Sequence, residues 1–291
     1  MKIRGFIIAG ITLVVLGVGS TAIASTQIDF DEGFPSAFSD PTLVQKEQTF
    51  GAISKITYDG SSENLEIHYS EGNNTFSYYE GEKLTYDITY DEELKTLSIQ
   101  QNHSYSFLNF SFGFNQKKAV LTINSALEEI DIDSGAGNVT VKDLTISKTN
   151  IEVNAANLKI ENSNITDLKL ESDAGNVHLM NLQASTSKLD VKAGNVKVEN
   201  SKLSSSTILV NAGNVNLKDT TFETLDAKLN AGNFTLSGDI LTRGEFKIDA
   251  GNLKLNLERP QSSYTVNAEG NGDTILVYKV SAGNPIIHYT E

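Results

Sequence analysis

Hydrophobic residues recur with a period of 19 positions through the second half of the chain. When Ala136 is counted as position 1 of a unit, positions 4 and 6 are apolar and position 5 is polar in each of the seven units that begin between residues 136 and 250. In the first unit, for example, Val139 and Val141 flank Thr140. Alternation with a period of two predicts a short β-strand with one buried face in each unit.

A second strand is predicted at positions 15 to 18 of the unit. In the first unit, Ile151 and Val153 alternate there with polar neighbours. Position 11 adds a further inward residue, as at Ile146. The unit is therefore predicted to run as strand, polar bend, single apolar plug, polar bend and second strand.

Every unit opens with the tripeptide Ala-Gly-Asn or a close variant. Glycine accepts positive φ and asparagine tolerates the left-handed region, so the tripeptide predicts a sharp corner. Asparagines stacked at the spacing of neighbouring strands can donate to one carboxamide and accept from the next, which predicts a hydrogen-bonded ladder. We favour this packing role over ligand binding. The predicted ladder comprises Asn138, Asn157, Asn176, Asn195, Asn214, Asn233, Asn252 and Asn271.

A period that never slips over eight copies indicates that each unit is one coil stacked on the last. The predicted fold is all-β: a single-stranded, β-helix-like β-solenoid of about eight 19-residue coils over residues 131–289. An irregular all-β region at 48–130 is expected to cap its N-terminal end. The seventh repeat loses its phase at Pro260, which predicts a C-terminal cap, and the off-phase tripeptide at 281–284 is interpreted as an ordinary turn.

The N-terminus has the features of an export signal. Lys2 and Arg4 precede an apolar run at 5–19, and Ala22 and Ala24 form a small-residue cleavage pattern. Residues 1–24 are therefore predicted to be a signal peptide or, alternatively, an uncleaved N-terminal membrane anchor, with 25–47 as a linker. In both cases the remainder is expected to be extracytoplasmic, either secreted or anchored to the cytoplasmic membrane or cell envelope. Membrane contact is expected only through residues 5–24.

Composition narrows the range of partners and chemistry. The chain has 23 Lys and Arg residues against 37 Asp and Glu residues, a net charge of −14, which disfavours nucleic acid as a partner. It has no cysteine, so disulfides and thiolate metal sites are excluded. A glycan-active β-helix enzyme would need clustered carboxylates on one outward face, whereas position 19 carries side chains of mixed sign. We therefore predict a non-enzyme without catalytic residues, cofactor or metal.

An aromatic stretch interrupts the first half of the chain. Phe110, Phe112 and Phe114 alternate with small or polar residues, which favours one strand with an aromatic core face. The alternative is a mobile loop that touches a partner or the membrane surface. These three residues are accordingly a candidate interaction patch.

The strands at 64–69 and 97–100, followed by Ile130-Asp-Ile-Asp-Ser-Gly-Ala-Gly-Asn-Val-Thr-Val141 and its serial copies, resemble the DUF4097 family of β-strand-repeat proteins, called putative adhesins. The resemblance covers residues 50–289, although the family usually has Gly-Asp where this chain has Gly-Asn. It implies an exported or membrane-anchored protein of Gram-positive bacteria, and some members are encoded with cell-envelope stress-response systems. The family carries no established catalytic residues, so none is transferred.

Three functional hypotheses remain from this reading. The first is a non-catalytic cell-surface or envelope protein that acts as an adhesin-like interaction module for a surface ligand. The second is a membrane-anchored accessory component of an envelope stress-response system, which would need a membrane-protein partner. A glycan-active β-helix enzyme ranks third.

Overall fold

The computed structural model of the chain describes residues 42–61, 63–103 and 118–291. All of these residues belong to one compact unit. The predicted leader and residues 25–41 of the predicted linker lie outside the described ranges. The end of the predicted linker overlaps the first strand, because β1 (Val44–Phe50) begins before residue 47.

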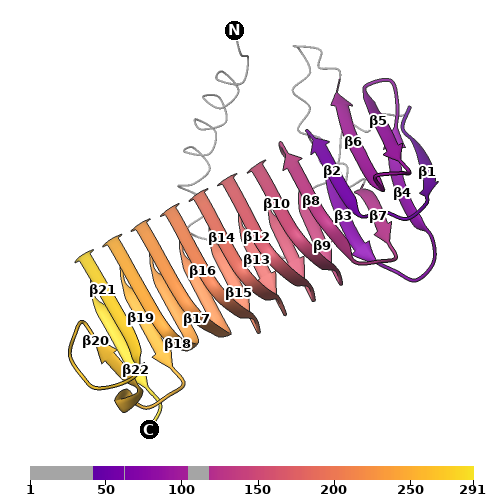
Figure 1. Cartoon of the computed structure of the whole chain (residues 1–291). Coiled ribbons are helices and arrows are strands. Elements are labelled where there is room, and N and C mark those ends of the chain that lie inside the picture. The colour runs from indigo at the N-terminus through magenta and orange to yellow at the C-terminus, as the bar shows by residue number, and fades with distance from the viewer. Residues whose placement is uncertain (1–41, 62, 104–117) are drawn as a thin grey trace, which may run out of the picture. The chain divides into compact units, whose positions relative to one another are not determined.

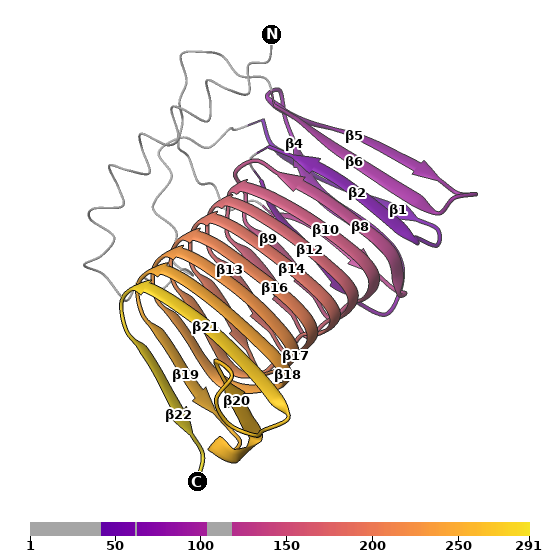
Figure 2. The same ribbon diagram turned by 60° about the vertical axis from the view of Figure 1, so that its left-hand side comes forward.

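Each 19-residue unit forms one coil of a β-solenoid, which confirms the predicted fold (Figure 1). A coil has a short strand and a long strand that meet at two corners, so the stacked coils enclose the core between a row of short strands and a row of long strands (Figure 2). The short strands include β9 (Val139–Lys142), β11 (Leu158–Glu161), β13 (Val177–Met180), β15 (Val196–Glu199) and β19 (Leu253–Leu257). The long strands include β10 (Thr145–Ala155), β12 (Asn164–Ala174), β14 (Gln183–Ala193) and β16 (Lys202–Ala212), while β17 (Val215–Ala231) and β18 (Phe234–Ala250) run through both parts of a coil.

Successive coils pair in parallel and in register. Val139 pairs with Leu158, which in turn pairs with Val177, so identical positions form rows along the stack. The side chains at positions 4 and 6 are at most 2% exposed from Val139 to Leu255. Full burial of one such side chain is worth about 1.5–3 kcal/mol, so these rows supply the main driving force for stacking.

The predicted polar bend between positions 11 and 15 is wrong, because one long strand runs through this stretch. Ile146 and Ile151 both lie in β10. The parallel ladder omits Ser147, and Ser147 and Lys148 both face outward, so the strand bends there without ending. The bend turns Thr149 inward, where it is 1% exposed and adds a further core row.

The N-terminal strands continue the solenoid, but their order in space differs from their order in the chain. β2 (Lys55–Gly60) and β3 (Asn64–Tyr69) form a coil that pairs in parallel with β8 (Leu127–Ser134) and β9. On the other side of that coil lie β6 (Thr96–His103) and β7 (Lys118–Ile123), which also pair with it in parallel. The coil built by β2 and β3 is therefore inserted between two coils that come later in the sequence. The expected boundary at residue 130 does not separate two kinds of packing.

Antiparallel strands close the N-terminal end of the stack. β4 (Asn74–Glu80) pairs with β7 and β1, and β5 (Leu84–Asp91) pairs with β6. Phe76, Tyr78 and Tyr86 pack against one another beneath these strands, with ring centroids 4.9–5.7 Å apart. This region has the capping role that the sequence predicts, although its inner strands belong to the solenoid.

The C-terminal end is a coil with an insertion. After β19 the chain forms a 3₁₀ turn at Gln261–Ser263 and β20 (Tyr264–Val266), and β21 (Thr274–Ala282) and β22 (Pro285–Tyr289) then complete the last coil. Ala282 pairs with Ala250, which is 32 residues earlier instead of 19, so 13 residues are inserted. Interpreting 281–284 as an ordinary turn is therefore wrong, because these residues form the corner of the last coil.

A buried polar network holds the inserted segment against the stack. Asp239, 6% exposed, accepts hydrogen bonds from Nε of Arg259 and from the hydroxyl of Tyr264, each at 2.5 Å. Nη2 of Arg259 also donates to Oγ1 of Thr274 at 2.9 Å. Burial and the neighbouring Asp239 raise the pKa of Tyr264, so this hydroxyl stays protonated and remains a donor.

Candidate interaction face

The outward side chains of the short strands carry two clusters of opposite charges between β3 and β15. Positions 5 and 7 point away from the core because their neighbours at 4 and 6 point into it. We call this row the short-strand face. Its residues, with those of the preceding coil, are Glu66, His68, Lys142, Lys159, Glu161, His178, Lys197 and Glu199.

Glu66 is the centre of a cation cluster at one end of this face. Its carboxylate, on β3, contacts Nζ of Lys118 on β7 and Nζ of Lys142 on β9, the latter at 2.8 Å. Nδ1 of His68 lies 3.1 Å from Oε1 of Glu66. Burial alone would raise the pKa of Glu66, which is 7% exposed, but the two lysines outweigh it and hold the pKa below its usual range.

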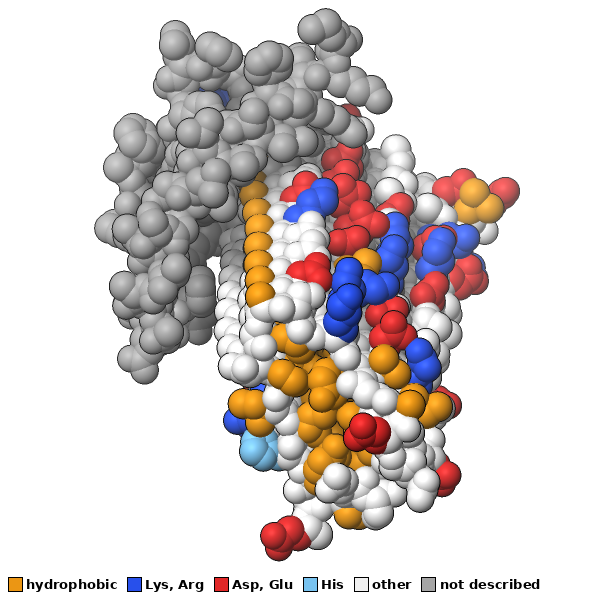
Figure 3. All heavy atoms as spheres, turned by 90° about the vertical axis from the view of Figure 1, so that its left-hand side faces the viewer, with side chains coloured by type: hydrophobic (Ala, Val, Ile, Leu, Met, Phe, Trp, Pro, Cys, Tyr) orange, Lys and Arg blue, Asp and Glu red, His pale blue; other side chains and the backbone are white. Residues whose placement is uncertain are grey.

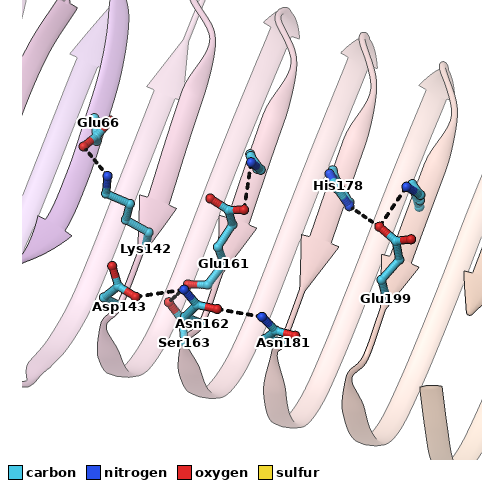
Figure 4. A network of polar contacts seen from close by, with 11 residues as sticks. Glu66, Lys142, Asp143, Glu161, Asn162, Ser163, His178, Asn181 and Glu199 are labelled. Carbon is cyan, nitrogen blue, oxygen red and sulfur yellow. Dashed lines mark hydrogen bonds and ion pairs between the residues drawn. The ribbon is translucent and has the colours of Figure 1, made fainter. Parts of the chain in front are cut away.

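A second cluster lies three to four coils from Glu66 along the same face. Nε2 of His178 and Nζ of Lys197 each lie 2.8 Å from Oε2 of Glu199 (Figure 4). The hydrogen bond from Lys197 is the main reason that the pKa of Glu199 is lowered. His178 and Lys197 are paired neighbours on β13 and β15, so the ladder itself brings the three side chains together. Between the clusters, Lys159 and Glu161 form a further ion pair.

A ladder of short polar side chains borders the short-strand face at the second corner of the coil. Nδ2 of Asn162 donates to Oδ1 of Asp143 at 3.0 Å, and Nδ2 of Asn181 donates to Oδ1 of Asn162 at 2.7 Å (Figure 4). These residues have φ of 49–59°, a conformation that Asn and Asp tolerate. This ladder was not predicted from the sequence. Its signal was the recurrence of Asn or Asp at position 8.

Seven of the eight asparagines of the predicted ladder lie in one row at the other corner. In each pair, Nδ2 and the backbone N–H of one asparagine both donate to Oδ1 of the asparagine 19 residues earlier, and the Nδ2–Oδ1 distances are 3.0–3.4 Å. The backbone N–H of Asn138 donates to Oδ1 of Asn64. Asn64 thus extends the row into the coil of β2 and β3, outside the 19-residue period.

Asn271 is not a member of this row, which corrects the prediction. The next corner after Asn252 is supplied by Asn284, whose backbone N–H donates to Oδ1 of Asn252 at 3.1 Å. The 13-residue insertion carries Asn271 into the segment between β20 and β21, so equal spacing in sequence no longer gives equal position in space.

Several sequence predictions receive no structural test. Phe110, Phe112 and Phe114 lie outside the described residues, as does the predicted leader. In the described parts of the chain, no helix is long and apolar enough to span a bilayer. Over the same residues, no group of three or more His, Asp or Glu side chains is arranged to hold a metal ion.

Comparisons with known proteins identify the fold. A model of the family described as Toastrack DUF4097 matches residues 53–278. A putative adhesin from Parabacteroides distasonis is 14% identical, with a TM-score of 0.58 over 86% of this chain and 98% of its own. A putative lipid binding protein from the same species is 14% identical, with a TM-score of 0.56 over 85% and 98%. A putative adhesin from Bacteroides fragilis is 16% identical, with a TM-score of 0.52 over 85% and 98%. No curated protein matches the chain.

Proposed function

Because the chain belongs to the Toastrack DUF4097 family, we propose that it is a non-catalytic interaction module held outside the cytoplasmic membrane, at the cell surface or in the envelope. Two of the similar structures are named putative adhesins, which supports this class of function. The leader-like residues 1–24 support export.

The observation that carries the proposal is the short-strand face. Lys159, His178 and Lys197 occupy the same outward position on three successive strands, which ladder hydrogen bonds hold about 4.8 Å apart. Such a row presents a fixed pattern of charge without any movement of the backbone. A fixed, shallow and charged surface suits recognition of an extended partner better than it suits catalysis, which needs a concave site that excludes water.

Protease treatment of intact host cells tests the location. We expect externally added protease to degrade the chain while a cytoplasmic marker protein survives. Fractionation and intact-mass analysis then separate two forms of the proposal. Release with a new N-terminus at Ser25 supports the adhesin-like module, and retention of the full-length chain in membranes supports the accessory component with a membrane-protein partner. A chain protected in the cytoplasm would refute both.

Charge reversal on one face tests which surface binds. The purified chain would be sedimented with isolated cell envelopes, with and without Lys159→Glu and Lys197→Glu. The matched control reverses Lys169 and Lys188, which are paired neighbours on the long strands and are also solvent-exposed. We expect the first variant to lose sedimentation and the control to retain it. Equal behaviour of the two variants would argue against the short-strand face.

A further inference from the structure

The last coil of the stack has one uncovered side. β22 pairs with β19 alone, and the outer edge of β21 is covered along its first half, where Tyr264–Val266 pairs with it and Oδ1 of Asn267 accepts the backbone N–H of Tyr278. Among the described strands, none pairs with the outer edge of β22. An edge strand of this kind is a template for pairing with another chain.

The core rows reach the surface at this end. Leu255 and Ile248 are fully buried, but their partners in the last coil, Ile287 and Val280, are only partly buried. Interior rows therefore end in apolar side chains that lack the cover of a further coil. Burial of this apolar area against another surface would be favourable.

The outward rows also change character in the last coil. Ile286 stands in the row of Lys254, and Ile275 stands in the row of Arg243. These two isoleucines are 45% and 44% exposed. Figure 3 shows hydrophobic side chains gathered over this end of the stack. The apolar surface thus extends from the open core onto both flanks of the last coil.

The distribution of charge indicates which partner could cover the apolar surface of the last coil. The chain has a net charge of −14, so two copies repel each other over most of their surfaces. β21 and β22 carry Lys279 as their only Asp, Glu, Lys or Arg residue, whereas the inserted segment beside β21 carries Glu258, Arg259, Glu269 and Asp273. The uncharged edge of β22 is therefore the part of this end where two copies can approach. Among the described strands, the edge strand at the opposite end is β1, which is exposed and mostly polar and bears the Lys46–Glu80 ion pair, so it does not match the apolar last coil.

We propose that the last coil is an interface between two copies of this chain, which meet end to end about a twofold axis. β22 of one copy pairs antiparallel with β22 of the other, and the half-covered core rows of the two copies close over each other. A twofold contact uses the same patch on both partners, so the single uncharged, apolar edge at β22 is sufficient to form it. The contact closes on itself and yields a dimer, not a filament.

Cysteine cross-linking in the full chain tests the contact, because the chain has no cysteine of its own. His288→Cys places a thiol on the outward side of β22, where a short bismaleimide can join two copies. Opposite or diagonal residues of an antiparallel pair lie within about 8 Å. Asn256→Cys is the matched control, since Asn256 pairs with His288 in the same row one coil inward. That step places the two thiols about 10 Å further apart.

We expect cross-linked dimer from His288→Cys and little from Asn256→Cys. Equal yields from the two variants, or a cross-link to a different protein, would overturn the proposal. Light scattering on the purified chain supplies an independent measurement, and we expect twice the mass of one chain.

Ile286→Lys is the disrupting variant, because it restores the lysine found in this row at Lys254 and leaves the core unchanged. We expect it to halve the mass while the circular dichroism spectrum stays the same. A monomeric wild type at every concentration, or a dimeric Ile286→Lys, would also overturn the proposal.

Discussion

A single amide side chain makes several contacts at each Ala-Gly-Asn corner. Nδ2 of Asn195 donates to Oδ1 of Asn176, and Oδ1 of Asn195 accepts the backbone N–H of Asn214. The backbone carbonyl of Asn195 accepts the N–H of Val177. An aspartate side chain could accept these hydrogen bonds but could not donate one. The row therefore requires asparagine, although aspartate has almost the same size.

Replacing Asn195 and Asn214 with Asp should lower the free energy of unfolding by about 1–3 kcal/mol at neutral pH, because donors are lost and like charges are stacked. Urea titration measures the change. Asn211→Asp is the control, because Asn211 accepts a hydrogen bond from Asn230 and its row already contains Asp173. Equal losses in the two variants would show that any added charge, not the ladder, is responsible.

Gly213 is fixed by two separate constraints. Its φ is 148°, and a Cβ there would lie 1.8 Å from the carbonyl oxygen of Gly194. Gly72 has φ of 120° but open space around its missing Cβ. Both Ala variants carry backbone strain of about 1–3 kcal/mol, and only Gly213→Ala adds a clash with the coil below. We therefore expect a lower urea midpoint for Gly213→Ala than for Gly72→Ala, and the reverse order would contradict the close stacking.

The 19-residue repeat made most asparagines of the corner row predictable. The two that were not predicted lie where the stacking departs from this period. Asn138 to Asn252 follow from the period alone. Asn64 could not be found in this way, because its neighbour Asn138 lies 74 residues later in the chain. Asn284 was assigned to an ordinary turn because the 13-residue insertion moves it off the 19-residue period, although its coil still stacks on the preceding one. A period in sequence predicts spatial rows only while no segment is inserted.

At the scale of elements, in-register pairing brings like charges together as readily as opposite ones. On the long strands β8, β10 and β12, the register places Glu152 between Asp133 and Glu171. Burial, and then the neighbouring carboxylates, raise the pKa of Glu152. When a carboxyl has a raised pKa in the folded state, its ionisation lowers the free energy of unfolding of the chain. This loss of stability is absent at low pH and complete once the pH exceeds the folded-state pKa.

Glu152→Gln should therefore stabilise the chain at neutral pH, by about 0.2–1 kcal/mol for relief of like-charge neighbours. The gain should vanish as the pH falls below the ordinary pKa of glutamate. Thermal unfolding across a pH series measures it. Glu171→Gln is the matched control, because the hydrogen bond from Lys169 lowers the pKa of Glu171 and gives the opposite sign. A gain for Glu152→Gln that persists in acid would contradict the electrostatic origin.

Short strands were easier to predict than long ones. The apolar pairs at positions 4 and 6 of the short strands alternate clearly with polar residues. Position 14 of the long strands is buried but carries Thr149, Leu168 and Ser187, so its mixture of polar and apolar residues does not reveal that it faces the core. The charged clusters of the short-strand face were also missed. Glu66 lies 76 residues before its partner Lys142, and only the non-sequential stacking of β3 on β9 brings them together.

At the scale of the whole stack, one coil should be removable as a unit. Deletion of residues 193–211 joins Lys192 to Ala212 and preserves every row, so the shortened chain should fold with the same β-rich circular dichroism. Deletion of residues 193–202 is the control, because it puts all later apolar rows out of register and should abolish cooperative unfolding. Equal folding of both variants would contradict a register-based core.

The inserted position of the coil made by β2 and β3 also has a mechanical consequence. A solenoid whose coils follow the order of the chain can be unwound from its end, one coil at a time, because each outer coil has only one neighbour. Here a pull on the N-terminus reaches β2, which pairs with both β6 and β8, and then β3, which pairs with both β7 and β9. Withdrawing this coil breaks four ladders together. The fold therefore resists a pull on the N-terminal side of the described chain more strongly than a solenoid whose coils follow the order of the chain.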